Sequence, residues 1–429
     1  MQVKFCYAKG NANAVKKICW RKMRSILHSD ANCFYASVEA VLNPELRDKA
    51  VAVCGSEEDR HGIVLAKSEK AKRAGVTTGM ACWEARSKCP DIIIVKPHFE
   101  YYSKFSKYLH EIYQRYTDLV EPFGLDECWL DVTNCLKSPM EIAEEIRQTV
   151  KDELGLTVSI GVSFNKVFAK LGSDLKKPDA ITEITEENFK SKIWGLPCSD
   201  LLYCGRSMTE KLKRIGVKTI GQIAELTHEY MMGKFGKAGS DLWIYANGLD
   251  NSQVAHKDHY EPAKSIGHGI TCVSDIRKLD EGNKVIYALC QDIGYKLRAM
   301  KLRAKGVSLG IKYKDLTYQG YQVKLENPTQ DEGFIAKTAC EILKKHYDPM
   351  HIIRALTVTA INLEDEDANE QISMFFDYEE REKREKLNKV IDEIKREYGS
   401  AAIKPAIILD EDKMPSKEQG KVLPGKMHR

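Results

Sequence analysis

Three acidic side chains, Asp30, Asp126 and Glu127, are the residues of this chain best suited to do chemistry. Asp30 ends a short strand-like run, and Asp126 and Glu127 lie in a turn between two apolar segments. Carboxylates that meet in space repel one another unless cations lie between them, and Mg²⁺ prefers oxygen ligands of this kind. The residues alone leave a second interpretation open, because an Asp-Glu pair in a turn is most often only hydrated.

The segments around these acids alternate between strand-like and helix-like patterns. Residues 25–30 read as a short strand, and residues 31–41 carry apolar side chains at helical spacing. A hairpin over residues 119–132 holds the acidic pair at its tip, and a helix over 140–154 and a strand over 156–162 follow. This alternation predicts an α/β or α+β first half.

The second half has a different organisation. Residues 186–258 predict short helices punctuated by glycine, and residues 264–364 predict four strands around two helices. An acidic stretch at residues 364–367 precedes a charge-dense helix over 378–397. Residues 405–429 are expected to be poorly ordered.

Length and composition exclude several classes of protein. The chain has 429 residues, 43% of them hydrophobic and 30% charged, with a formal net charge of +4. This composition is that of a globular protein of about three domains, not of a collagen, a coiled coil or a disordered chain. No apolar run approaches the roughly 18 residues of a membrane span, so we expect no membrane partner. The 13 cysteines include no CxxC pair, which favours reduced core thiols and a cytoplasmic location.

Three sequence motifs together resemble those of the Y family of translesion DNA polymerases. They are DANCFYASVE at residues 30–39, GLDECWLD at residues 124–131 and SIGVSFNKVFAKLGSDLKKP at residues 159–178. They follow the family's order and separations, and KSIG at residues 264–267 resembles the start of the family's little finger domain. The resemblance covers about residues 23–363 and indicates the bacterial polymerase IV/V branch.

The resemblance implies an α+β multidomain fold shaped like a right hand, with a palm, small fingers, a helical thumb and a little finger holding a βαβ-type sheet. Because Met23 stands just before the first strand, we expect the preceding residues to be a leader that need not be native. The implied boundaries are 1–22 for the leader, 23–33 and 98–185 for the palm, 34–97 for the fingers, 186–258 for the helix-hairpin-helix-like thumb, 259–364 for the little finger, and 365–429 for an acidic linker, a sliding-clamp-binding peptide and a helical tail.

The resemblance also implies a metal site. Asp30, Asp126 and Glu127 match the family's metal-binding carboxylates, and the backbone carbonyl of Ala31 matches a further ligand. The implied cofactor is a pair of Mg²⁺ ions, for which Mn²⁺ could substitute. Two ions roughly 3.5–4 Å apart can activate a primer hydroxyl and hold the leaving pyrophosphate.

The implied nucleotide site contains Phe34, Tyr35, Lys72 and Lys177. Tyr35 matches the steric gate, whose ring lies where a ribose 2′-OH would project, and Lys177 matches a lysine that contacts the triphosphate. The fingers depart from the family, because Glu69 and Lys72 stand where a Tyr and an Arg are usual. A lysine can act as a point charge but cannot form the forked contact that an arginine makes with phosphate, and an inward-pointing Glu69 would repel a triphosphate.

Charge distribution favours a DNA partner. Seven cations and no acid occur between residues 296 and 314, which suits contact with a phosphate backbone without base readout, although a hydrated helix face would look similar. In the thumb, residues 202–206 replace a Pro-Gly-x-Gly turn, so that one hairpin glycine is missing. The implied DNA-binding residues are Gly205, Lys296, Arg298, Lys301, Arg303 and Lys305.

Together these features predict a template-directed, low-fidelity DNA polymerase that works on damaged template. We expect its partners to be primer-template DNA, dNTPs and a sliding clamp, and we expect the chain to act as a monomer. The alternative is a catalytically weak DNA- and clamp-binding module of the DNA-damage response, which Glu69 and the altered thumb turn would favour. A nucleotide cyclase that shares the palm would explain neither the thumb nor the clamp peptide.

The clamp prediction depends on the segment QISMFF at residues 371–376, which resembles the bacterial clamp-binding peptide. Its polar anchor would be Gln371, and Met374, Phe375 and Phe376 would fill an apolar pocket on the clamp's β subunit. The alternative is that the two phenylalanines pack against the little finger.

Phe375→Ala should therefore abolish clamp binding and leave basal primer extension intact, because only the apolar anchor is lost. Binding of the purified β clamp to the variant and the wild type measures this directly. An undiminished clamp complex would leave only the packing interpretation.

Overall fold

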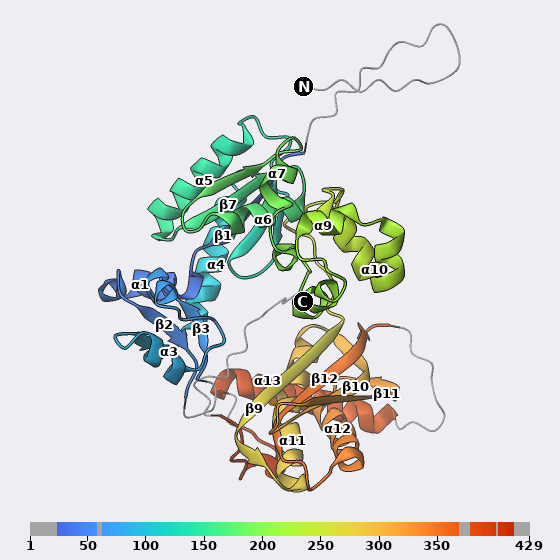
Figure 1. The fold of residues 1–429 in the computed structure, drawn as a ribbon. Coiled ribbons are helices and arrows are strands. Elements are labelled where there is room, and N and C mark those ends of the chain that lie inside the picture. The colour runs from blue at the N-terminus through green and yellow to red at the C-terminus, as the bar shows by residue number, and fades with distance from the viewer. Residues whose placement is uncertain (1–23, 58–61, 369–377, 400–401, 416–429) are drawn as a thin grey trace. The chain divides into compact units, whose positions relative to one another are not determined.

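The computed structural model describes residues 24–57, 62–368, 378–399 and 402–415, and Figure 1 shows their fold. They divide into two compact units. The main boundary between the units falls between His259 and Tyr260, next to the predicted boundary of thumb and little finger. The mixture of helices with three sheets confirms the predicted α+β class. The predicted clamp-binding peptide lies outside the described residues.

A five-stranded sheet forms the centre of the first unit, in the order β5-β6-β1-β7-β8. The middle strand is buried along its whole length and is antiparallel to both of its neighbours. The predicted first strand and the predicted hairpin are thereby confirmed. The strands are β1 (Ile26–Ala31), β5 (Val120–Pro122), β6 (Glu127–Asp131), β7 (Val158–Ser163) and β8 (Ile181–Ile184).

Helices cover both faces of this sheet, because alternate residues of β1 join different apolar clusters. Leu27 packs with side chains of α4 (Phe99–Tyr113) and α5 (Pro139–Leu154). Ile26 packs in a separate cluster with a residue of α6 (Lys166–Leu175).

Helix α6 lies directly on the sheet because of a glycine. A Cβ atom on Gly161 of β7 would stand only 1.9 Å from the carbonyl oxygen of Ala169 in α6. Any side chain at this position would push the helix away from the sheet. The glycine therefore keeps the polar residues of α6 close to the end of β1.

The predicted fingers contain a three-stranded sheet in the order β3-β2-β4, and the predicted thumb is helical. In the thumb, Tyr203 adopts a positive φ of 66° in the turn where the hairpin glycine is missing. These elements are η1 (Pro44–Leu46), β2 (Val51–Cys54), β3 (Val64–Lys67), β4 (Ile93–Val95), α1 (Phe34–Leu42), α2 (Glu69–Arg73), α3 (Cys82–Lys88), α7 (Phe189–Ile193), η2 (Cys198–Asp200), α8 (Arg206–Lys213), α9 (Ile220–Glu225) and α10 (His228–Ala246).

The second unit is built on a four-stranded antiparallel sheet in the order β11-β10-β12-β9. Two helices, α11 and α12, share one core with it, as predicted for residues 264–364. Every helix in the described part of the chain is too short or too polar to span a membrane. The elements are β9 (Ser265–Ile276), α11 (Leu279–Ala299), β10 (Leu302–Tyr313), β11 (Tyr318–Thr329), α12 (Glu332–His346) and β12 (Ile353–Asp365).

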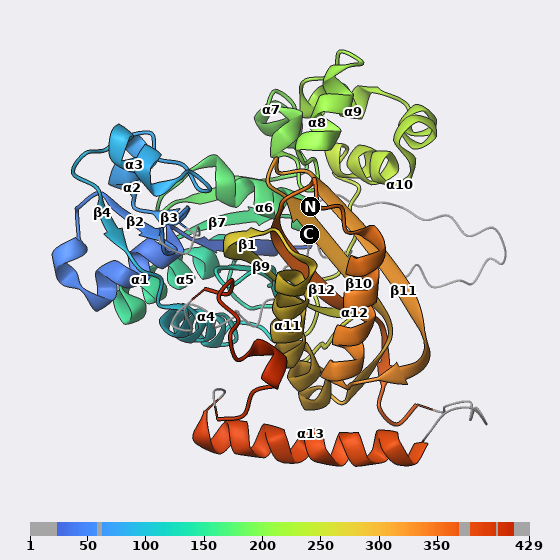
Figure 2. The ribbon, with the colours of Figure 1, turned by 90° about the horizontal axis from the view of Figure 1, so that it is seen from below.

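The C-terminal segment packs on this unit, which corrects part of the sequence prediction. Helix α13 (Tyr378–Tyr398) lies across α11 and α12, as Figure 2 shows, and a short η3 (Ala406–Ile408) follows it. Residues 405–415 were expected to be poorly ordered, but the backbone of Lys413 accepts a hydrogen bond from Val273 N–H and Met414 packs against the core. Sequence analysis missed this docking because the contacts join segments far apart in the chain.

The docking of α13 is polar and centres on Arg298. The Arg298 side chain is only 6% exposed and forms ion pairs with Glu332 of α12 and with Asp392 of α13. Both Asp392 oxygens accept from its guanidinium, at 2.6 and 2.9 Å. Because this guanidinium is buried and already paired, Arg298 is not available to bind DNA as predicted. Asn388 adds a hydrogen bond of 3.4 Å to Asp331.

Asp392→Ala should destabilise the second unit, because it removes two charge-assisted hydrogen bonds from a buried guanidinium. A loss of about 1–3 kcal/mol is expected, since Glu332 still pairs with Arg298. Thermal unfolding of the intact chain measures the change, with the exposed neighbour Glu393→Ala as the control. Equal melting temperatures for the two variants would contradict the docking of α13.

Candidate active site

The fold brings the predicted acids together at one end of the central strand. Asp30, at the end of β1, pairs in antiparallel register with Glu127 of β6. The N–H of Ala31 donates to the carbonyl oxygen of Asp126 at 3.0 Å, which ties the hairpin tip to β1. Asp30 is only 6% exposed. Three carboxylates and the Ala31 backbone therefore meet where both the strand and the hairpin end.

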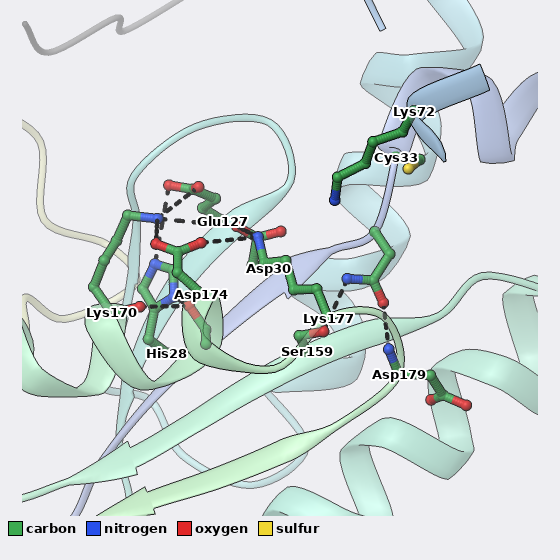
Figure 3. Close-up of polar contacts among 12 residues, drawn as sticks. His28, Asp30, Cys33, Lys72, Glu127, Ser159, Lys170, Asp174, Lys177 and Asp179 are labelled. Carbon is green, nitrogen blue, oxygen red and sulfur yellow. Dashed lines mark hydrogen bonds and ion pairs between the residues drawn. The ribbon is translucent and has the colours of Figure 1, made fainter. Parts of the chain in front are cut away.

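Two lysine ammonium groups lie among these carboxylates, as Figure 3 shows. Lys177 Nζ is 2.7 Å from Asp30 Oδ2 and 2.9 Å from Asp174 Oδ1. Lys170 Nζ is 2.8 Å from Glu127 Oε1, 3.4 Å from Asp174 Oδ2 and 3.9 Å from Asp30 Oδ2. The lysines thus supply positive charge to a group of acids that would otherwise repel one another.

Lys170 and Asp174 were not among the predicted site residues. Together with Lys177 they follow the i, i+4, i+7 spacing of one helix face, on α6 and just beyond its end. That spacing was a usable signal, because the other side chains of α6 are mostly apolar and buried.

Burial is the main cause of the raised pKa values of the acids in this site, and neighbouring negative charge adds to it. Burial raises the pKa of Asp126 to about 6, and the negative charge of Asp30 adds to the shift. Burial also raises the pKa of Glu127, although the ammonium group of Lys170 opposes it. For Lys170 itself burial lowers the pKa, but the charges of Glu127 and Asp174 outweigh burial and raise it. Burial therefore disfavours the ionised forms of Asp126 and Glu127 even beside the two lysines, and further positive charge would favour them.

The uncharged ring of His28 lies beside the site, and sequence analysis did not find it. Its ring is completely buried, with Nδ1 at 2.8 Å from Ser173 Oγ and its edge against Trp129. Burial, followed by the charges of Lys170 and Lys177, lowers its pKa well below the usual value. The ring is therefore uncharged near neutral pH and contributes no counter-charge to Glu127.

Tyr35 is held in one orientation by its neighbours. Its ring stacks on Tyr102 with 4.2 Å between centroids and 10° between planes, and Phe99 meets it edge-on. The buried Tyr102 hydroxyl donates in turn to buried Glu39. The ring of Phe34 is only 4% exposed and packs in the palm core, so a contact of Phe34 with a nucleotide would have to come from its backbone.

Glu69 points toward the turn that follows β1. Its Oε1 accepts a hydrogen bond from Cys33 Sγ at 3.2 Å, and Lys72 Nζ lies 3.6 Å from the same oxygen. Burial and the hydrogen bond to Glu69 raise the pKa of Cys33 to about 12, so that the thiol stays protonated and can donate. The charge of Glu69 is therefore partly offset by its own neighbours.

Comparisons with known proteins identify the family. Residues 29–174 match the impB/mucB/samB family, and residues 263–374 match the impB/mucB/samB family C-terminal domain. DNA polymerase IV of Acetivibrio thermocellus is 47% identical, with 90% of this chain and 98% of the relative covered. DNA polymerase IV of Clostridium acetobutylicum is 34% identical, with the same coverage. The chain belongs to the Y family of DNA polymerases.

The fold of this chain matches that of a solved Y-family polymerase structure. A Y-family DNA polymerase chimera of Dbh and Dpo4 matches with a TM-score of 0.70 and 22% identity, covering 79% of this chain and 98% of the chimera. The relatives named DNA polymerase IV, at 47% and 34% identity, confirm the predicted enzyme class, a DNA-directed DNA polymerase of the Y family.

The acids of this Y-family polymerase are not arranged around a single point. Within the residues that the structure describes, no three Asp, Glu, His or Cys side chains could together hold one metal ion. The reason is visible in the contacts, because Asp30 turns to Lys177 and Glu127 turns to Lys170. The donors nonetheless fit a hard cation in kind, since all of them are oxygens.

The predicted DNA-contacting residues have different environments in the polymerase. Lys296 pairs with Asp292 at 2.7 Å and Lys305 with Glu364 at 2.8 Å, whereas Lys301 is exposed. Arg303 is half-buried, and Gly205 is the N-cap of α8. The thumb also contains a hollow of about 500 Å³ that sequence analysis missed; Lys211, Arg214, Ile215, Lys234 and Phe235 line it.

Proposed function

We propose that this chain carries out low-fidelity, template-directed synthesis across damaged DNA by adding dNTPs to a primer 3′-OH. The observation that supports this most strongly is the meeting of Asp30, Asp126 and Glu127 at the ends of β1 and its partner hairpin. Membership of the Y family supports the reaction class.

In this proposal the three carboxylates and the carbonyl of Ala31 hold two Mg²⁺ ions, and Mn²⁺ could take their place. When bound, such ions lower the pKa of the primer hydroxyl and stabilise the leaving pyrophosphate. The raised pKa of Asp126 is consistent with the proposal, because a cation beside a carboxyl group whose ionised form is disfavoured by burial would favour that ionised form. A cation bound at Oδ2 of Asp30 would displace Lys177, whose ammonium group could then contact the triphosphate.

Tyr35 is proposed as the steric gate that excludes ribonucleotides. The stacking on Tyr102 supports this role, because it restricts rotation of the Tyr35 ring away from a ribose 2′-oxygen. Lys72 is proposed to reach the triphosphate as a point charge once it leaves Glu69.

Lys296, Lys301, Arg303 and Lys305 are proposed to contact the DNA backbone, together with Gly205 at the N-terminus of α8. The basic hollow of the thumb is a further proposed phosphate contact. Contacts of this kind give strong salt dependence and little sequence preference. Arg298 is left out because it is buried.

The sliding clamp as a partner, a monomeric state and a cytoplasmic location remain proposals that the sequence alone supports. The alternative is a catalytically weak module, and contacts in the structure bear on the two features that favoured it. Glu69 is held by Cys33 and Lys72, and Tyr203 takes the left-handed conformation at the altered thumb turn.

Asp126→Asn should lower primer extension by about 10³-fold and leave DNA binding intact, because it removes a ligand charge without changing side-chain volume. Single-turnover extension with Mg²⁺ and a DNA-binding titration measure the two effects. Asp118→Asn, at an exposed acid that pairs with Lys257, is the matched control. Extension retained by Asp126→Asn would refute the metal assignment, and a wild type that binds DNA without extending it would favour the alternative.

Tyr35→Ala should raise ribonucleotide incorporation relative to dNTP incorporation by at least about tenfold, because it removes the ring that would clash with a 2′-OH. Parallel single-nucleotide extensions with dNTP and rNTP give the ratio. Tyr101→Ala, an exposed tyrosine of α4, serves as the control. Unchanged sugar discrimination in Tyr35→Ala would remove the gate role.

A further inference from the structure

Lys177 stands on a short loop, residues 176–180, that joins α6 to β8. A lysine on a loop has many conformations, and holding one of them has an entropic cost. Lys177 Nζ nevertheless lies 2.7 Å from Asp30 Oδ2, so the loop backbone must be fixed by other contacts.

One such contact comes from Asn32, two residues after Asp30. Its side-chain Oδ1 accepts a hydrogen bond of 2.8 Å from the backbone N–H of Asp179, two residues after Lys177. Its Nδ2 donates to the Oγ of Ser159 at 2.9 Å, which fixes the orientation of the amide. Dashed lines in Figure 3 mark both bonds. Asn32 is 5% exposed and Ser159 is completely buried.

A second contact fixes the same point of the loop from the other side. The carboxylate of Asp179 accepts from Arg147 at 2.9 Å and from Lys151 at 3.0 Å, both on α5. Asp179 has a positive φ of 54°, so the chain turns sharply here. The loop is thus held between the turn after β1 and helix α5.

We propose that Asn32 is a positioning residue for the incoming nucleotide, acting through Lys177. Its amide fixes the loop that carries Lys177 to the turn that carries Asp30 and Ala31. In this way the backbone that carries the proposed metal ligands and the backbone that carries Lys177 are fixed relative to each other. The inference rests on the proposed role of Lys177 and assigns no contact between Asn32 and the nucleotide.

A purely structural role for Asn32 would have a different signature. An apolar side chain of similar size would leave the Asp179 N–H and the Ser159 hydroxyl without a partner, which lowers stability in either case. Only the positioning role predicts that dNTP affinity falls through Lys177. The two effects can be separated by a double-mutant cycle.

The experiment measures the dNTP dependence of single-turnover extension for the wild type, Asn32→Leu, Lys177→Met and the double variant. This separates the dNTP dissociation constant from the maximal rate. Asn32→Leu should weaken dNTP binding about tenfold and change the maximal rate much less, because a misplaced contact group loses binding. In the Lys177→Met background it should cause no further loss of affinity.

Each outcome decides a separate point. If Lys177→Met leaves dNTP affinity unchanged, the proposed role of Lys177 fails. If Lys177→Met weakens binding but Asn32→Leu does not, or if the two effects add, the positioning role of Asn32 is overturned. Should Asn32→Leu fail to fold, Ser159→Ala replaces it in the same cycle, with an expected loss of about threefold because only the bond that orients the amide is removed.

Discussion

Repulsion among half-buried and buried carboxylates at the end of β1 is the constraint on which the rest of this site depends. Asp30, Asp126 and Glu127 are brought together by backbone pairing, which takes no account of their charges. The protein offsets the repulsion with two lysines that approach from α6 and from the loop after it. These internal cations offset part of the negative charge that the backbone pairing brings together.

The lysines can do this only because α6 lies directly on the sheet. Gly161 permits that close approach. The low pKa of the buried His28 keeps its ring uncharged, so that it adds no positive charge beside Lys170. Asn32 then fixes the end of the loop that carries Lys177. The absence of a side chain at Gly161 thus positions α6 on the sheet, and one hydrogen bond of Asn32 positions the loop after α6. The placement of the two lysines among the acids follows from these contacts.

Motif spacing and periodicity were enough to predict the first strand, the hairpin that carries Asp126 and the elements of the second unit. The i, i+4, i+7 spacing places Lys170 and Asp174 on one face of α6, but which charged groups they meet depends on where α6 crosses the sheet. At Phe34 and Arg298 the family resemblance implied ligand contacts, whereas the structure shows that both side chains are buried. Local pattern predicts what a segment forms, whereas burial depends on segments that lie far away in the chain.

The docking of the C-terminal segment has a consequence for how the protein is made. The core of the second unit includes Met414 at its edge, and its buried Arg298 has Glu332 as a partner but gains its second carboxylate only when Asp392 is present. Domains generally fold as units while the chain emerges from the ribosome. This unit begins near Tyr260 but cannot complete its packing until residues beyond 400 have been synthesised, so it remains unfinished during synthesis of a large part of the chain.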